Sequence, residues 1–442
     1  MNIRYFLIGT CLFLLSSCNN FLEVKPKGII IPEKLVDYQG LLNAPSMTRT
    51  FPINLLDFTD DNLNSFEPTV ESATANGYFW RPVLTLNVEA NPDVWGPLYR
   101  SIYSANVIIN GVMGAAEGTD EQKRSTRAEA YLVRAICYMD LLTVFAKSYN
   151  EATAATDPGV PLVISTDVNE KIPPRSSVAV TLESIRGDVE AAIADLPQNN
   201  INRYRSTKYA AYGLLTRIYL YMANYEEALK YVTLALEGPY RLLDYNEYAD
   251  NTSVPVYDLN PEVLWQRAAV SGSPIFMLYS DDLKSYFENN DLRYTFLTLA
   301  NNSGLGRNSF GGVYNFGITY PEMYLTQAEL LARDGKIEQS MAIINNLRKH
   351  RILRSAYIDL SATSPDQALE LVLMERRREL AYSGLRWFDM KRLDQEGRMP
   401  EVKRIHPVTK VVEATLSPKS PHYTFEMPAR VKAFNPNIET NF

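Results

Sequence analysis

Residues Tyr324 to Leu347 read YLTQAELLARDGKIEQSMAIINNL, and this stretch decides the expected fold. Bulky residues recur in it at three- and four-residue steps on both sides of Asp334-Gly335, where a turn is expected. Residues 212–235, YGLLTRIYLYMANYEEALKYVTLA, follow the same plan with a turn at Asn224-Tyr225. Each stretch therefore predicts two amphipathic helices joined by a tight link.

The two stretches share the spacing of a 34-residue helix–turn–helix repeat of the tetratricopeptide type. The matching positions are Tyr212, Leu215, Thr216, Tyr219, Ala228, Val232 and Ala235, and then Tyr324, Gln327, Ala328, Leu331, Ser340, Ile344 and Leu347. Small residues stand where the second helix must come close, and Thr216 and Gln327 are weak matches. Such pairs stack because neither can bury its own apolar face alone. We therefore expect a mainly α fold of divergent tetratricopeptide pairs.

Other segments extend this plan. Apolar periodicity predicts helices over about 120–147, where Asp120 forms half of an N-terminal cap, and over about 180–195. Residues 148–178 are rich in proline and threonine and are expected to form an ordered loop. Residues 240–320 are rich in Asn, Gly, Ser and aromatic residues, which favours an ordered, functional, partly β face.

The composition excludes several classes of protein. The chain has 442 residues, of which 46% are hydrophobic and 21% charged, and this balance is typical of a globular protein. Its net charge of −7 argues against nucleic-acid binding, which needs a concentrated basic face. Three His and three Cys leave little material for a zinc or iron–sulfur centre. His350, His406 and His422 also lack ligand spacing, so we expect no metal and no cofactor.

The N-terminus has the pattern of an export signal. Arg4 precedes a run of about ten apolar residues, which is too short to span a bilayer. The run ends in Leu15-Ser16-Ser17-Cys18, a pattern of bacterial lipoproteins in which residues 1–17 are removed and Cys18 is acylated. An ordinary signal peptide with a chance cysteine is the alternative. Cys137 would then be the one free thiol, in a buried helix face.

Four segments, in this order, resemble the SusD/RagB family of nutrient-binding lipoproteins. Asn19 to Gly28 resembles the start of their mature chains, and Trp95 to Asn106 resembles their first helix. Glu375 to Arg392 resembles their most recognisable C-terminal segment, and Asn435-Pro436-Asn437 to Phe442 resembles their ending. The chain is on the short side for the family. The resemblance implies one domain over residues 18–442, with parts of about 18–230 and 231–442 intertwined on one repeat scaffold.

The resemblance also implies a function. Members sit on the extracellular face of the outer membrane as lids of a TonB-dependent, SusC-like barrel, and they bind oligosaccharides or, in some cases, peptides without catalysis. We therefore expect a lipid-anchored surface protein with those partners. The alternative is a tetratricopeptide scaffold lipoprotein that binds only protein.

An early acidic loop supplies the first candidate site residues, Asp60, Asp61 and Asn62, with Asp57 and Asn64 beside them. A glycosidase pair would need carboxylates facing each other across about 5–10 Å, which neighbours on one loop rarely do. A calcium site would lack the spacing and the terminal Glu of an EF-hand. The family places this loop near the ligand pocket, which favours acceptors for ligand hydroxyl groups.

Aromatic residues supply the second set of candidates. Tyr78-Phe79-Trp80-Arg81 is a dense aromatic cluster whose rings could stack on sugars, although a buried strand is an equal alternative. Asn301 to Asn308 is a polar loop, and its Arg307, together with Tyr314, could form the other wall of a pocket.

Charged residues near the C-terminus are interpreted structurally. The segment from Glu375 to Arg392 could supply a catalytic carboxylate with arginines that clamp an anionic substrate. The mixture of charges and aromatic residues favours a solvated, salt-bridged helix end that packs Trp387 and Phe388 against the core, with Asp389 paired to Arg386 or Lys391. Asp291-Leu292-Arg293 is expected to form a local ion pair.

Overall fold

The computed structural model describes most of the chain, and helices are its main regular elements. The described residues are 32–51, 58–63, 72–92, 94–250, 253–255, 259–269, 279–296, 298–301, 304–307, 315–406 and 408–442. The longer helices are α2 (Leu35–Asn43), α6 (Trp95–Gly111), α7 (Asp120–Phe145), α8 (Val178–Ile193), α9 (Lys208–Tyr221), α10 (Tyr225–Leu236), α13 (Tyr320–Arg333), α14 (Ile337–Lys349), α15 (Pro365–Glu379) and α16 (Arg386–Gln395). The shorter ones are α3 (Pro45–Thr48), α5 (Ala73–Tyr78), α11 (Asp281–Ser285), α12 (Leu292–Phe296) and α17 (Ala429–Phe434).

The strands are short and pair only two at a time within the described residues. β1 (Arg49–Phe51) pairs in parallel with β5 (Ala268–Ala269). The antiparallel pairs are β2 (Pro158–Pro161) with β3 (Arg175–Ser177), β4 (Val263–Trp265) with β8 (Ile318–Thr319), β6 (Thr298–Asn301) with β7 (Gly304–Arg307), and β9 (Val402–Ile405) with β10 (Val412–Leu416). These pairs lie in the connections between helices, so the body of the molecule is helical.

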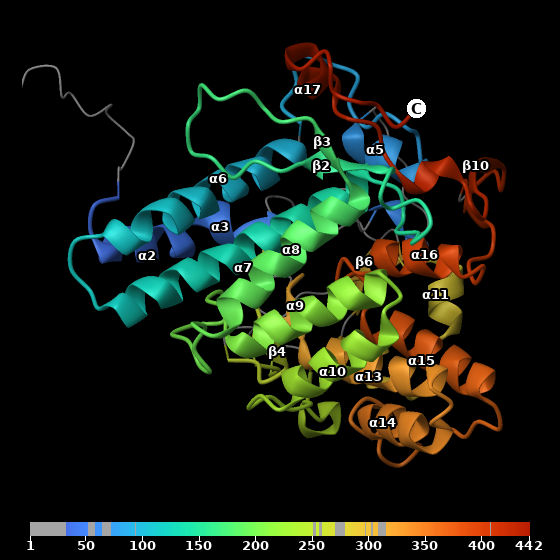
Figure 1. Cartoon of the computed structure of the whole chain (residues 1–442). Coiled ribbons are helices and arrows are strands. Elements are labelled where there is room, and N and C mark those ends of the chain that lie inside the picture. The colour runs from blue at the N-terminus through green and yellow to red at the C-terminus, as the bar shows by residue number, and fades with distance from the viewer. Residues whose placement is uncertain are drawn as a thin grey trace, which may run out of the picture.

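The helices stack in chain order, which confirms the expected repeat architecture. α6, α7, α8, α9 and α10 each pack on the next, as Figure 1 shows. The two hairpins expected from the sequence are α9–α10 and α13–α14, and α10 packs directly on α13 although residues 237–319 separate them. The buried Arg217 of α9 also pairs with Glu322 of α13 at 2.5 Å. The long excursion therefore leaves the stack and returns to it.

Local sequence explains where α7 begins. The hydroxyl of Thr119 accepts a hydrogen bond from the backbone of Gln122, whose side chain accepts one from the backbone of Thr119. This capping box satisfies two amide groups that a helix start leaves without partners. The expected half-cap at Asp120 is thus corrected by one residue, because Asp120 is the first helical residue. No described helix is both long enough and apolar enough to cross a membrane.

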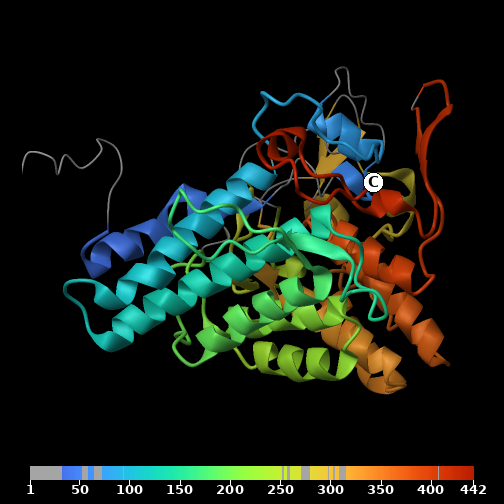
Figure 2. The ribbon, with the colours of Figure 1, turned by 45° about the horizontal axis from the view of Figure 1, so that its top comes forward.

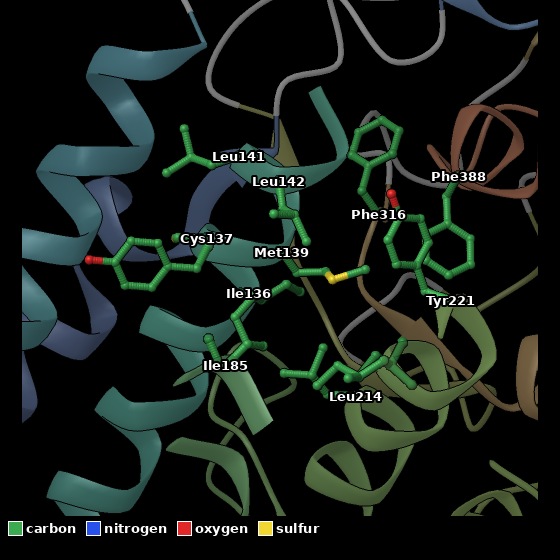
Figure 3. Close-up of a cluster of buried hydrophobic side chains, with 14 of the residues drawn as sticks. Ile136, Cys137, Met139, Leu141, Leu142, Ile185, Leu214, Tyr221, Phe316 and Phe388 are labelled. Atoms are coloured by element: carbon green, nitrogen blue, oxygen red, sulfur yellow. The ribbon is translucent and has the colours of Figure 1, made fainter. Parts of the chain in front are cut away.

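The largest apolar core runs through the helical stack, and α7, α8 and α9 contribute many of its residues. Figure 3 shows side chains such as Ile136, Ile185 and Leu214 directed toward one another, and all three are buried. Cys137 lies in the same region with no exposed surface, and burial raises the pKa of its thiol to about 12. It is a free, packed core residue, as expected.

The first described helix and the β9–β10 hairpin lie at opposite ends of the molecule. α2, the first helix of the described chain, lies at one end of the stack in both views, and the hairpin of β9 and β10 projects from the other end (Figure 2). Arg386 of α16 and Arg404 of β9 contact the early acidic loop.

Candidate functional site

The acidic loop at residues 58–63 is held in place by one arginine from β9. The guanidinium of Arg404 donates hydrogen bonds to the backbone carbonyls of Phe58, Asp60 and Leu63 over 2.8–3.0 Å. It donates a further one to the carbonyl of Tyr78 over 2.9 Å. Because Arg404 is 2% exposed, the loop is anchored to the C-terminal part of the chain from the inside.

Asp61 is the best-placed candidate of this loop, and two arginines hold it. Arg386 forms a bidentate pair with its carboxylate at 2.6 and 2.7 Å, and Arg377 lies at 3.4 Å. Burial alone would raise the pKa of Asp61, but the two guanidinium groups hold it well below its usual range. A carboxyl group held ionised in this way is a poor general acid, which weakens the hydrolase interpretation.

Asp60 and Asn62 point into the protein rather than toward solvent. Both have no exposed surface. Asp60 accepts a hydrogen bond from the backbone of Asn62 over 2.8 Å, and the amide oxygen of Asn62 accepts one from Arg377 over 3.0 Å. The prediction that Asp60 and Asn62 present acceptors to ligand hydroxyl groups is therefore corrected. Both side chains are buried and form hydrogen bonds within the protein. Asp57 and Asn64 lie outside the described residues.

The aromatic candidates Tyr78 and Trp80 are also buried, at 2% and 1% exposure. The guanidinium of Arg404 lies 4.1 Å from the ring centre of Tyr78 and 4.3 Å from that of Trp80. The indole of Trp80 donates to the carbonyl of Thr59 over 2.7 Å. The prediction that Tyr78 and Trp80 stack on sugars is corrected, because both rings pack against the buried guanidinium of Arg404. The alternative of a strand is wrong as well, since Tyr78 ends α5 and Trp80 has a φ of 52°.

The other candidates are less fully described. Arg307 ends β7, where its backbone pairs with Thr298 of β6, and its side chain is outside the described part of the structure. Tyr314 and Cys18 lie outside the described residues. The hairpin β6–β7 does place Arg307 within the connection between the two repeat hairpins, and the roles of these three residues remain predictions.

A cavity of about 800 Å³ opens beside the acidic loop. Its walls come from that loop, α11, α15, α16 and β9, and they include Asp61, Tyr286, Arg377 and Arg386. A volume in this range suits a small-molecule ligand. Its charged side chains are largely paired with one another, for example Arg377 with Asp282 at 2.5 Å. The described walls of the cavity therefore offer polar contacts to a ligand from charged side chains that already pair with one another.

Comparisons with known proteins connect this architecture to a family. One family model, described as starch-binding and associating with the outer membrane, matches residues 20–220. A second, described as the SusD family, matches residues 217–430. The chain belongs to the SusD family. The resemblance seen in four short segments is thereby confirmed over nearly the whole sequence.

Curated relatives of this SusD-family chain are distant in sequence. SusD-like protein P38 of Formosa agariphila is 22% identical over 482 residues, covering 88% of this chain and 91% of the relative. SusD-like protein P25 of the same organism is 25% identical over 312 residues, or 66% of this chain. The aligned part spans only about half of P25, 53% of its length.

Solved structures share the SusD-family fold. A SusD superfamily protein from Bacteroides thetaiotaomicron aligns with a TM-score of 0.74 at 21% identity, over 92% of this chain and all of the other. Surface glycan-binding protein A from Bacteroides uniformis aligns with a TM-score of 0.71 at 16% identity, over 92% and 99% of the two chains. At these identities the comparison establishes the fold.

The C-terminal segment typical of the family is a buried ionic network, which corrects the expected solvated helix face. Glu375 has no exposed surface and pairs with Arg293 at 2.6 Å and Arg378 at 2.5 Å. Asp389 pairs with Arg376 and Arg392, both at 2.8 Å, and not with Arg386 or Lys391. The expected Asp291–Arg293 pair does form, at 2.7 Å, but it is buried within this network.

Lys391 has a different role from the one expected. Its ammonium group is buried and donates to the carbonyls of Thr143 and Ala146, at the C-terminal end of α7. Burial lowers its pKa to about 7. A cation at this position satisfies helix carbonyls that lack partners. Sequence reasoning missed this docking because the acceptors are backbone atoms, which leave no residue pattern.

Proposed function

We propose that this chain is a lipid-anchored glycan-binding protein of the outer cell surface, which passes oligosaccharides to a TonB-dependent barrel of the SusC type. The observation that carries the proposal is the pair of family models that together span residues 20–430 in order. The first is described as starch-binding and associating with the outer membrane. The lipoprotein pattern ending at Cys18 supports the same location.

The oligosaccharide would bind to residues 237–319, here called the irregular face, rather than to the helical stack. Residues 237–319 interrupt the stack between α10 and α13, and they carry β6–β7 and the candidates Arg307 and Tyr314. Aromatic rings that stack on sugar faces, with polar side chains fixing the hydroxyl groups, would give binding without chemistry. The cavity beside Asp61, which Ser280 and Tyr286 of the same stretch also line, offers fixed, ion-paired polar groups to a ligand.

The ligand-binding part is tested by titrating the purified chain, from Cys18 onward with Cys18→Ser, with a panel of neutral and acidic oligosaccharides. We expect micromolar-to-millimolar dissociation constants for one class and unchanged ligand on chromatography afterwards. Arg307→Ala and Tyr314→Ala should weaken binding, whereas Tyr103→Ala on α6 should not. Tyr103 is a suitable control because it is 41% exposed on the helical stack. Release of shorter sugars would contradict a purely binding role.

The location and partner are tested in cells. The wild-type chain should fractionate with the outer membrane, be degraded by external protease, and copurify with a large barrel. Cys18→Ala should lose the membrane association because no acyl chain can be attached. A protein-binding scaffold without sugar affinity would instead copurify with partners and fail every titration.

A further inference from the structure

A second cavity lies at the C-terminal end of α7, and it shares no wall residue with the cavity beside Asp61. Its volume is about 350 Å³. Four separate segments form it, namely the turn after α7, the end of α16, residues 419–424, and residues 441–442. We call it the C-terminal pocket. Its size lies at the lower end of the usual range for small-molecule sites.

Hydrogen bonds to the end of α7 and to Phe425 hold the late segments of the C-terminal pocket in place. The side-chain amide of Asn441 donates to the carbonyls of Phe145 and Phe425 over 2.8 and 2.7 Å. The hydroxyl of Thr424 donates to the carbonyl of Ala146 over 3.2 Å. These contacts hold the late segments against the helix in one arrangement, so a ligand would meet a preformed site.

The polar groups of the pocket are balanced in charge. Lys147 pairs with Asp157 at 2.8 Å, and Asp157 also accepts a hydrogen bond from the hydroxyl of Thr153 over 2.6 Å. The carboxylate of Asp394 accepts a hydrogen bond from the backbone amide of Lys419 over 2.8 Å. Two lysines and two aspartates thus line the pocket, and their groups can donate hydrogen bonds to ligand hydroxyl groups and accept hydrogen bonds from them. The pocket therefore suits a neutral, polyhydroxylated ligand.

An exposed aromatic ring adds the second feature of a sugar site. Among the described residues, the exposed aromatic side chains are Tyr103, Phe434 and Phe442. Of the three, Phe442 is the one that lines the C-terminal pocket, and it is 52% exposed. An apolar ring beside paired polar groups can cover the C–H face of a sugar while those groups bind its hydroxyls.

We propose that the C-terminal pocket is a second saccharide site, which takes one or two neutral sugar rings. The proposal rests on the proposed glycan-binding function but assigns a site away from the irregular face. Two sites on one rigid body would retain a long glycan more firmly than either alone, provided that its chain spans both.

The test uses saturation-transfer NMR of the chain with maltose, cellobiose, lactose and xylobiose, alongside titration with longer oligosaccharides of the same sugars. Phe442→Ala and Asp157→Asn should reduce disaccharide binding roughly three- to tenfold, the loss expected for one ring or hydrogen-bond contact. Phe434→Ala is the matched control, because Phe434 is 72% exposed and lies outside the pocket. Thermal melts would verify that each variant is folded.

Two results would overturn the second site. One is disaccharide binding that is unchanged in Phe442→Ala and Asp157→Asn. The other is absence of any disaccharide binding while longer oligosaccharides still bind, which would leave the proposed function standing. Failure of both disaccharides and longer oligosaccharides would instead count against glycan binding as a whole.

Discussion

Helices α7 and α8 are joined mainly by apolar contact, whereas α15 and α16 are joined to their surroundings by buried charge. In the first region, Ile136, Leu142 and Ile185 are buried, and one ion pair crosses between the helices, Arg134 with Asp188 at 2.6 Å. In the second, four consecutive charged residues, 375–378, are at most 7% exposed. Apolar contact tolerates small shifts, but a buried ion must keep its partners. The C-terminal region should therefore be the more easily broken by a single substitution.

The largest effect is expected from Glu375→Ala. It would leave the buried Arg293 and Arg378 without a carboxylate that now lies 2.6 and 2.5 Å away. Removing one partner from a buried ion network costs about 3–5 kcal/mol of unfolding free energy. Glu183→Ala is the control, because that carboxylate pairs with Arg186 at 2.5 Å but is 66% exposed. Its loss should cost less than about 0.5 kcal/mol in the same urea titration. Equal losses of unfolding free energy in Glu375→Ala and Glu183→Ala would contradict the importance of buried charge in the C-terminal region.

The second prediction concerns acid. Burial would raise the pKa values of Glu375 and Glu329, but the surrounding arginines hold both at about 2, against an ordinary value of 4.5. A lowered folded pKa gives stability that is present above pH 4.5 and is lost as pH falls toward 2. Each group should thus cost the fold about 1 kcal/mol per pH unit below 4.5.

The acid effect separates the two regions when it is measured on two variants. The penalty of Glu375→Ala should shrink between pH 4.5 and pH 3, because over that range the unfolded wild-type chain binds a proton at Glu375 that the folded carboxylate does not. The penalty of Leu142→Ala, about 2–5 kcal/mol for a buried leucine, should stay constant over the same range. Urea midpoints at four pH values would measure both, and parallel curves would contradict the assignment.

The sequence predicted the apolar region correctly and the charged region incorrectly. Apolar spacing identified both repeat hairpins and α7, because a buried helix face must recur every three or four residues. The charges of Glu375 to Arg392 fit a solvated helix face in sequence, since some of their buried partners, such as Arg293 and Glu329, come from distant parts of the chain. A clue was available in the i, i+3 pairs Glu375–Arg378 and Asp389–Arg392, which flank Trp387. The prediction for Tyr78 and Trp80 was wrong for the same reason, because their cationic partner, Arg404, comes from β9 far along the chain.

The smallest effect tests how tightly the apolar region is packed, with two glycines in helix interiors. A Cβ at Gly213 of α9 would lie 2.6 Å from Cγ2 of Ile318, so β8 would have to move away. At Gly187 of α8 a Cβ would meet nothing within 4 Å.

Gly213→Ala should therefore destabilise the chain by about 1–3 kcal/mol, as overpacking does. Gly187→Ala should stabilise it by about 0.5–1 kcal/mol, because alanine loses less backbone freedom than glycine in a helix. Thermal melts of the two variants would measure shifts of opposite sign. If both substitutions stabilised the chain, the contact between α9 and β8 would be looser than the structure has it. The apolar region would then tolerate substitution even where its helices approach a strand most closely.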